Sequence, residues 1–449
     1  MNENKKVPVL SKLAYGSGAA GGNVVSTILA AFLLSYYTDS AKMGMAAIGT
    51  MFLVCRILDG VTDVIMGGIV DKTNTRFGKA RPWLLVAAPA LAVGLYLILN
   101  VPSGFSEGGK MVYAYFTYIF LNCIAFTIFG IAHASLLARM TLDYNDRTNT
   151  SVVSSICNNL SGIVVGTITT GMVMKLGWRT TSMILAAACF ILVMIAFLGV
   201  KEKVGIDETT GRVKTKEAPF REALPLVLKN RYFYSILFIG IFVLLMNANA
   251  IASTIYYCNN VIGDPMFMGT LMSIGQIPGV LILFIMPSLS RKFGRREFMA
   301  GGCMALIIGF AILGLAGQNR TLVLVGTVLR SIGAGPIFAG IFAFIADITD
   351  YGEWKYGVRT EGLISAAQSV GSKVGIGLGS GMTSWILAAG GYVGGSKVQS
   401  ASAIAAIRFD FGWLGMILSV LLLIAVIMMD VEKYMPEVKE ALNKKHQAE

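Results

Sequence analysis

The stretch "RILDGVTDVIMGGIVDK", residues 56–72, combines the two properties that decide the fold. Most of it is apolar enough for a lipid bilayer, yet Arg56, Asp59 and Asp63 stand three and four residues apart inside it. An ionised side chain at the centre of a membrane helix costs about 2.5–3.5 kcal/mol on insertion scales. Such groups therefore normally face a cavity lined by protein, and we expect this stretch to be a membrane helix with one charged face.

The rest of the chain has the same apolar character. It has 449 residues, of which 55% are hydrophobic and 14% are charged, and its mean hydropathy is +0.68. Soluble domains carry about 25% charged residues. Repeated apolar runs of about 20 residues are each long enough to cross ~30 Å of hydrocarbon. The residues after Met1 lack the apolar core and cleavage site of a signal peptide, so we expect the first run to be a retained helix.

Twelve membrane spans are predicted from these runs. They lie near 13–38, 45–70, 82–101, 111–137, 151–174, 180–200, 231–259, 267–289, 298–317, 321–347, 362–389 and 408–430. Lys and Arg concentrate in alternate connections, which predicts a multi-pass membrane protein with both termini in the cytoplasm. The net charge of +12 follows from these loops, so no nucleic-acid partner is expected.

The spans fall into two halves. "RFGKAR" at 76–81 follows the second span, and the similar "KFGRRE" at 292–297 follows the eighth. We expect an all-α membrane protein of two six-helix bundles. Such a duplicated transporter architecture has its binding site between the two halves. The predicted domains are a bundle with the cation site at 1–200, a cytoplasmic linker at 201–230, and a second bundle with the tail at 231–449.

The acidic pair predicts a binding site for a coupling cation. Spacing of four places Asp59 and Asp63 on one helical face, with Arg56 and Thr62 about one turn away. Carboxylate oxygens are hard ligands whose charge a bound Na⁺ or H⁺ would neutralise. The alternative is a structural ion pair between Arg56 and Asp59, which would leave Asp63 to be explained. For the pair together we favour the cation site, with both carboxylates as Na⁺ ligands if sodium is the coupling ion.

Basic groups inside the later spans predict contacts to substrate. Lys373 lies about 18 Å into the eleventh span, and Arg330 lies about nine residues into the tenth. Lys373 either contacts substrate or balances the aspartates, and Arg330 either contacts substrate or pairs with a carbonyl. An anionic substrate is attractive if both face the cavity, because a guanidinium can bind a carboxylate through two hydrogen bonds. His133 is either a proton relay or a structurally satisfied histidine.

Catalytic chemistry is not indicated by the sequence. It contains no nucleophile with a base, no Walker loop and no cluster with metal-ligand spacing, and none of the six cysteines forms a CxxC pair. We expect neither an enzyme nor a bound cofactor, and the only ion expected is the coupling cation.

Five motifs along the chain are distinctive: "LSYYTD" at 34–39, "RILDGVTD" at 56–63, "DKTNTRFGKARPWLL" at 71–85, "KMVYAYFTY" at 110–118 and "DITDYGEWKYGVRTEGL" at 347–363. They resemble one transporter family, the glycoside–pentoside–hexuronide:cation symporters, the melibiose permease branch of the major facilitator superfamily. The resemblance covers nearly the whole chain and is closest to bacterial glucuronide carriers.

Site residues follow from this resemblance position by position. It implies a cation site at Asp59 and Asp63, lined or supported by Thr62 and Thr127. It also implies that Lys373 links the cation and sugar sites. Gln368 and Ser369, one turn earlier, match further cavity positions.

Departures from the family pattern bear on the substrate. Acidic residues that hold a galactoside in the family are replaced here by Asn23 and Gly130. Its aromatic partners match Phe126 and Ala134, and an arginine of the fifth span matches Ser155. The grip on a neutral galactoside is therefore not expected, and Asn23 is expected to contact a different sugar.

The function expected from the resemblance is import of a glycoside, with a glucuronide or another hexuronide favoured. Arg56, Arg330 and His133 complete the residues expected near substrate. The alternatives are a pentoside (xyloside) symporter, a neutral glycoside symporter, a lysolipid symporter, and a receptor or membrane enzyme without flux. We expect alternating access by a monomer whose partners are the sugar, the cation and the bilayer.

Overall fold

The fold is helical throughout the part of the chain that the structure covers. The computed structural model describes residues 7–141, 143–202, 220–278, 281, 294–357, 361–396, 398–438 and 440–441. Within these ranges there is no β-strand, and the one β-bridge joins Thr75 to Gly78 in a loop. The prediction of an all-α protein is confirmed.

The chain forms two compact units. The first holds residues 1–213 with the short segments 264–273 and 393–398, and the second holds 214–263, 274–392 and 399–449. Most of the predicted linker, residues 203–219, lies outside the described residues. The domain boundaries given above as the limits of two membrane bundles stay a prediction.

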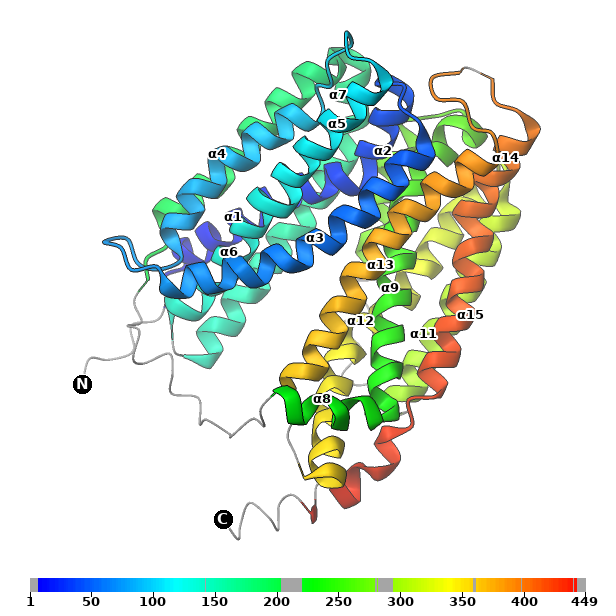
Figure 1. Ribbon diagram of the computed structural model, residues 1–449. Helices are drawn as coiled ribbons and strands as arrows, with labels where there is room; N and C mark the ends of the chain where they lie inside the picture. Colours follow the sequence, from blue (N-terminus) through cyan, green and yellow to red (C-terminus); the bar gives the residue numbers. More distant parts are fainter. Residues whose placement is uncertain are drawn as a thin grey trace. The chain divides into compact units, whose positions relative to one another are not determined.

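The first unit contains the predicted first six spans (Figure 1). Its elements, with π-helical segments labelled η1, η2 and η3, are α1 (Val9–Thr27), η1 (Ile28–Phe32), α2 (Leu33–Ser35), η2 (Tyr36–Ser40), α3 (Met45–Lys72), α4 (Arg81–Ile98), α5 (Glu107–Tyr118), η3 (Ile119–Phe126), α6 (Thr127–Met140) and α7 (Tyr144–Gly199). The fifth and sixth spans share α7, which turns at Gly177. This residue has φ of 74°, a conformation that favours glycine.

The second unit contains most of the remaining spans. Its elements, with η4 and η5 π-helical and η6 a 3₁₀-helix, are α8 (Phe220–Lys229), α9 (Arg231–Tyr257), η4 (Cys258–Ile262), α11 (Arg295–Ala316), α12 (Arg320–Tyr356), α13 (Glu361–Ala389), α14 (Ala401–Arg408), η5 (Phe409–Trp413), α15 (Leu414–Ile427) and η6 (Val431–Tyr434). A helix over 267–278 corresponds to the start of the predicted span 267–289, and the structure describes only residue 281 of that span beyond it.

Helices of membrane-spanning length confirm a multi-pass protein. Eight helices among the described residues are long and apolar enough to cross a bilayer, and one of them, Asn145–Gly199, holds two predicted spans. Many large apolar side chains are exposed on these helices, including Val64 at 78% and Phe116 at 70% exposed. Apolar surface of this kind suits a lipid environment, in which it has no water to avoid.

Glycines set the contact between α9 and α13 in the second unit. Gly371, Gly375 and Gly379 recur every four residues along one face of α13. A Cβ atom at Gly371 would lie 2.8 Å from the carbonyl oxygen of Leu237, and the other two glycines press on α9 carbonyls in the same way. Small residues at this spacing let two helix backbones approach closely, as in membrane helix pairs of the GxxxG type.

In each unit a glutamate carboxylate accepts hydrogen bonds from backbone amides at the start of a helix, an arrangement that we call a glutamate clamp. In the first, the Glu202 carboxylate accepts hydrogen bonds from the backbone amides of Lys79, Ala80 and Arg81 at 2.8–3.0 Å. In the second, the Glu432 carboxylate accepts from the amides of Arg295 and Arg296 at 3.1–3.3 Å. Each acid thus satisfies amides at the start of a helix, α4 or α11, that have no partner within the helix.

The clamps match in further detail. The Arg81 side chain donates to the carbonyl of Phe197 at 2.8 Å, and the Arg296 side chain donates to that of Ile427 at 2.6 Å. Each carbonyl lies five residues before the clamping glutamate. Gly78 and Gly294, which precede α4 and α11, both have positive φ. In the described part of the two similar stretches, residues 78–81 and 294–297, the sequence echo therefore corresponds to a shared local structure.

Candidate cation and substrate site

The two aspartates of α3 meet at one hydroxyl group. Thr127 Oγ1 lies 3.2 Å from Asp59 Oδ1 and 3.0 Å from Asp63 Oδ1. The two carboxylate oxygens are consequently no farther apart than the sum of these distances. Asp59 is buried at 7% exposed, Thr127 is buried at 4%, and Asp63 is half-buried. The structure therefore brings the predicted acidic pair together with the predicted threonine.

Thr127 comes from a different helix than the two aspartates. It is the first residue of α6, directly after the π-helical segment η3. Thr62 adds a second hydroxyl, whose Oγ1 lies 3.5 Å from Thr127 Oγ1 and donates to the Asp59 carbonyl at 3.1 Å. Four side chains from two helices thus supply carboxylate and hydroxyl oxygens at one place.

Arg56 approaches the same cluster from one turn earlier on α3. Its Nη1 lies 3.6 Å from Asp59 Oδ2, a distance longer than a good charged hydrogen bond. The guanidinium therefore compensates part of the Asp59 charge, and the ion-pair interpretation applies to this oxygen. The other oxygen of Asp59 is directed to Thr127 and hence to the group shared with Asp63.

The donor set suits a hard monovalent cation or a proton. Carboxylate and hydroxyl oxygens are the ligands that hard cations prefer. Among the described residues, no group of three or more His, Cys, Asp or Glu side chains could hold a metal ion. A metal ion at this place would therefore be held by the two carboxylates and the hydroxyls of Thr62 and Thr127.

Asn23 belongs to a polar cluster that only the structure reveals. Its Nδ2 donates to Asn158 Oδ1 at 3.2 Å, and its Oδ1 accepts from the Thr27 hydroxyl at 3.0 Å. Both asparagines are half-buried, and α1 packs along α7 to bring them together. Sequence analysis identified Asn23 but missed Asn158 and Thr27, because the pairing depends on how α1 and α7 pack.

A backbone carbonyl group and two aromatic rings hold His133 in place. Its Nε2 lies 3.0 Å from the Tyr15 carbonyl oxygen, and its ring stacks on that of Tyr15 with 4.0 Å between centroids. Phe129 stacks on the other side at 5.3 Å, and the histidine is 9% exposed. These contacts explain the burial of His133 as packing between α1 and α6, without a ligand.

Arg330 in the second unit retains an unused hydrogen-bond donor. Its Nη1 is buried and has no hydrogen-bond partner. The guanidinium carbon lies 5.7 Å from the centre of the Phe310 ring, and a Cβ atom added at Gly275 would lie 3.7 Å from Nη2. Gly275 therefore lies directly beside this guanidinium.

The predicted residues of α13 lie on neighbouring turns. Gln368 Nε2 donates to Ser372 Oγ at 2.8 Å, so part of its hydrogen-bonding capacity is used within the helix. Ser369 is exposed and Lys373, one turn later, is half-buried. The close packing of α13 on α9 fixes the backbone from which these side chains project.

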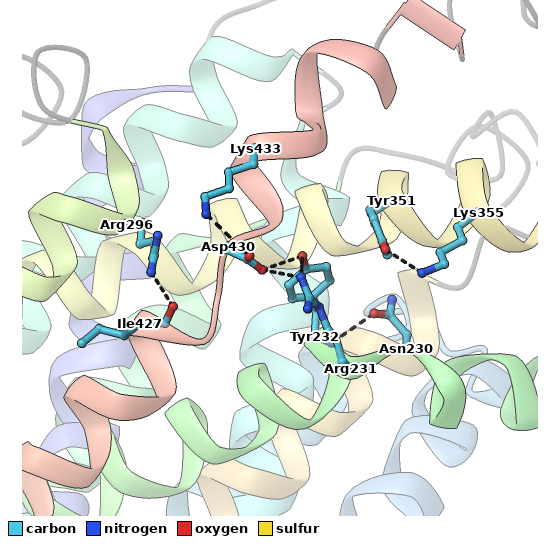
Figure 2. A network of polar contacts seen from close by, with 9 residues as sticks. All are labelled: Asn230, Arg231, Tyr232, Arg296, Tyr351, Lys355, Ile427, Asp430 and Lys433. Atoms are coloured by element: carbon cyan, nitrogen blue, oxygen red, sulfur yellow. Dashed lines mark hydrogen bonds and ion pairs between the residues drawn. The ribbon is translucent and has the colours of Figure 1, made fainter.

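A polar network occupies the end of the second unit where α9 begins (Figure 2). Asp430 Oδ1 accepts from Arg231 Nη2 at 2.6 Å and from the Tyr232 hydroxyl at 2.7 Å. On α12, Lys355 donates to the Tyr351 hydroxyl at 2.9 Å, and this hydrogen bond raises the pKa of Lys355. The Asp430 contacts join α9 to the segment after α15, and the rings of Tyr232 and Tyr351, edge to face at 5.0 Å between centroids, join α9 to α12.

Comparison with protein families gives one match to nearly the entire chain. A family described as MFS/sugar transport protein matches residues 14–433. The matched residues include the α3 carboxylates, the Asn23 cluster and Arg330.

Three curated proteins are similar to the chain. The isoprimeverose transporter of Lactiplantibacillus pentosus is 30% identical, over 99% of this chain and 93% of its own length. The glucuronide carrier protein homolog of Escherichia coli is 28% identical, over 90% of this chain and 89% of its own length. A putative glycoside/cation symporter, YagG of Escherichia coli, is 25% identical over 89% of this chain and 87% of its own length.

Proposed function

Because the chain belongs to the MFS/sugar transport protein family, we propose that it imports a glycoside by symport with a cation bound at Asp59 and Asp63. Membership of the family makes it a sugar transporter of the major facilitator fold and not an enzyme. The observation that carries the cation assignment is the single Thr127 hydroxyl within 3.2 Å of both carboxylates. The glycoside/cation symporter similar to this chain supports coupling to a cation.

The cation step follows from the electrostatics of the pair. Two nearby carboxylates resist simultaneous ionisation in a partly dry site, so binding of Na⁺ or H⁺ relieves their repulsion. Thr62 and Thr127 would complete the oxygen ligands. We expect cation binding to precede sugar binding and the two units to exchange access between the membrane faces only with both ligands present.

The favoured substrate is a glucuronide or another hexuronide. Arg330 offers a buried guanidinium N–H without a partner, and a carboxylate is the group that such a donor binds best. Asn23 and Asn158 offer amide groups suited to sugar hydroxyls. The similarity to the glucuronide carrier homolog agrees with an acidic sugar.

A neutral pentoside is the second candidate. The isoprimeverose transporter is more similar to this chain, at 30% identity, than the glucuronide carrier homolog is. In that case Arg330 would serve the packing of α12 against Phe310 on α11 instead of binding substrate.

Orientation determines the driving force. With both termini in the cytoplasm of the bacterial inner membrane, one cation moving inward across 100 mV contributes about 2.3 kcal/mol. This is enough for roughly fifty-fold accumulation of a neutral sugar.

The deciding experiment is uptake of a labelled phenyl β-glucuronide into proteoliposomes, first under a Na⁺ gradient and then under an H⁺ gradient. We expect accumulation under one gradient, its loss in Asp63→Cys, and retained exchange of sugar in that variant. Glu437→Gln, at an exposed glutamate, is the matched control and should accumulate sugar normally. Gradient-driven uptake by Asp63→Cys at the wild-type level would contradict the cation assignment.

The substrate is tested separately with Arg330→Gln. If the guanidinium binds the sugar carboxylate, uptake of the glucuronide should fall about 10–100-fold, the value of a lost hydrogen bond to a charged group. Binding of a neutral xyloside should change little. Equal losses for both sugars would assign Arg330 to packing, and absence of any glucuronide uptake by the wild type would favour the pentoside.

A further inference from the structure

One carboxyl group of the second unit is completely buried and has been given no role above. Asp410 lies in η5 and is 0% exposed. Sequence analysis passed over it because it stands two residues after Arg408, at the very start of a predicted span. The π-helical turn that contains it is a rare conformation that is frequent at functional sites.

Polar residues of two other helices surround this carboxyl. Asn249 on α9 uses its Nδ2 to donate to Asp410 Oδ1 at 2.7 Å and to Thr383 Oγ1 at 2.9 Å. Thr383 lies on α13. Asn249 is 1% exposed and Thr383 is 0% exposed. The amide group of Asn249 on α9 therefore links the carboxyl group of η5 to a hydroxyl group of α13.

The other oxygen of Asp410, Oδ2, is buried without a hydrogen-bond partner. The hydroxyl group of Ser384, the residue after Thr383, is also buried without a partner. No salt bridge reaches Asp410 from the residues that the structure describes. An ionised carboxylate without a compensating charge is very unfavourable in such a place, and proton uptake is the usual escape.

The ionisable groups on the elements packed against η5 do not supply that charge. The ring of Tyr257 stacks on the neighbouring Phe411 at 4.1 Å between centroids. Lys373 is ten residues before Thr383, about 15 Å along α13, and Arg408 is exposed. α15 carries no ionisable side chain. The other ionisable residues on these elements and on the adjoining η4 are Arg231, Tyr232, Tyr234, Tyr256, Cys258, Arg295, Arg296, Glu297, Cys303 and Glu361.

We propose that Asp410 is a proton-binding site of the second unit, neutral in the folded protein, with Oδ1 accepting from Asn249 and the proton carried by Oδ2. A proton fits better than a metal ion because Asn249 presents its amide hydrogens, not its oxygen, to the carboxyl group. The bound proton lets α9, α13 and η5 pack together around a polar centre. This inference rests on neither the identity of the sugar nor the cation at Asp59.

The consequence is a stability that depends on pH with a definite sign. The folded state holds this proton, whereas the unfolded chain releases it at neutral pH. The free energy of unfolding therefore falls as pH rises. For one proton, the equilibrium constant for folding falls by up to about tenfold per pH unit.

Infrared spectroscopy of the purified full-length protein at neutral pH tests the proposal directly. The wild type should show the C=O stretching band of a protonated carboxyl group, and Asp410→Asn should lose part of it. Asp430→Asn is the matched control, because Asp430 pairs with Arg231 at the surface and should contribute nothing to this band. An undiminished band in Asp410→Asn, or a band at Asp410 that appears only when Na⁺ is removed, would overturn the proposal.

Thermal unfolding supplies a second readout. Asn at position 410 keeps the acceptor for Asn249, so this variant should fold. From about pH 4, where the carboxyl group of an unfolded aspartate loses its proton, up to neutral pH, the melting temperature of the wild type should fall more steeply than that of Asp410→Asn. Parallel curves for the two proteins would contradict a proton held by Asp410.

Discussion

Thr127 is the residue on which the proposed cation site depends most sharply, because one hydroxyl group contacts two carboxylates. Thr127→Val keeps the shape of the side chain and removes that hydroxyl. The loss of a hydrogen bond to a charged group should weaken cation binding by about 10–100-fold. The measurement is the cation concentration that gives half-maximal sugar uptake in proteoliposomes.

Thr127→Ser is the control for this change, since it retains the hydroxyl and loses only a methyl group. It should restore most of the cation affinity. An unchanged cation dependence in Thr127→Val would remove the threonine from the site and leave the aspartates as the only ligands.

At the scale of residues, local spacing predicts some contacts and not others. Asp59 and Asp63 share a face because they are four residues apart on one helix, and this holds before any tertiary structure is known. Asn158 lies 135 residues from Asn23, so only helix packing brings the two together. Asp410 was overlooked for a different reason. A carboxyl group beside Arg408 resembles the end of a loop, and hydropathy does not reveal that it is buried.

At the scale of elements, the contact of α9 with α13 is open to a direct test. Gly375→Ala would press a methyl group against the carbonyl of Ile241, which belongs to the backbone and cannot rotate away. We expect destabilisation of about 1–3 kcal/mol, the usual effect of overpacking. Gly301→Ala on α11, where nothing lies within 4 Å, is the control. Melting curves in detergent that coincide for the two variants would argue against this packing.

The clamp at the start of α4 is a second element-scale test. Glu202→Ala removes the acceptor of three backbone amides, and a lost helix cap costs about 0.5–2 kcal/mol. We expect a lower melting temperature than in the wild type, while Glu437→Ala, at an exposed glutamate, should be neutral. Glu432→Ala should match Glu202→Ala if the two clamps are equivalent, and stability unaffected by either change would refute their role.

The sequence predicts the helices better than their internal irregularities. Apolar runs locate the helices of the described residues, apart from the span predicted at 267–289, of which only the first part is described, because hydropathy sets where a chain can enter lipid. The π-helical turns at Ile119–Phe126 and Phe409–Trp413 have no such signal. They widen a helix by one residue per turn without changing its composition, so their positions depend on tertiary packing.

At the scale of the whole molecule, the predicted orientation can be checked by cysteine labelling. Gly104→Cys, in the loop between α4 and α5, should react with an impermeant maleimide in intact cells. Thr75→Cys, in the loop between α3 and α4, should react only after the membrane is opened. The native cysteines allow this experiment, because five of the six are buried and Cys157 is half-buried. Labelling in the reverse order would place the termini outside the cell.

The two glutamate clamps also bear on the order in which the protein is made. Glu202 ties the start of α4 to the residues that follow α7, so the contacts of the first clamp all lie within residues 79–202 and can form before the second half is synthesised. Glu432 has the corresponding place near the end of the chain. Each half therefore carries its own closing residue at its own end. Two short segments of the second half, 264–273 and 393–398, also belong to the first unit, so that unit is completed only after they have been synthesised.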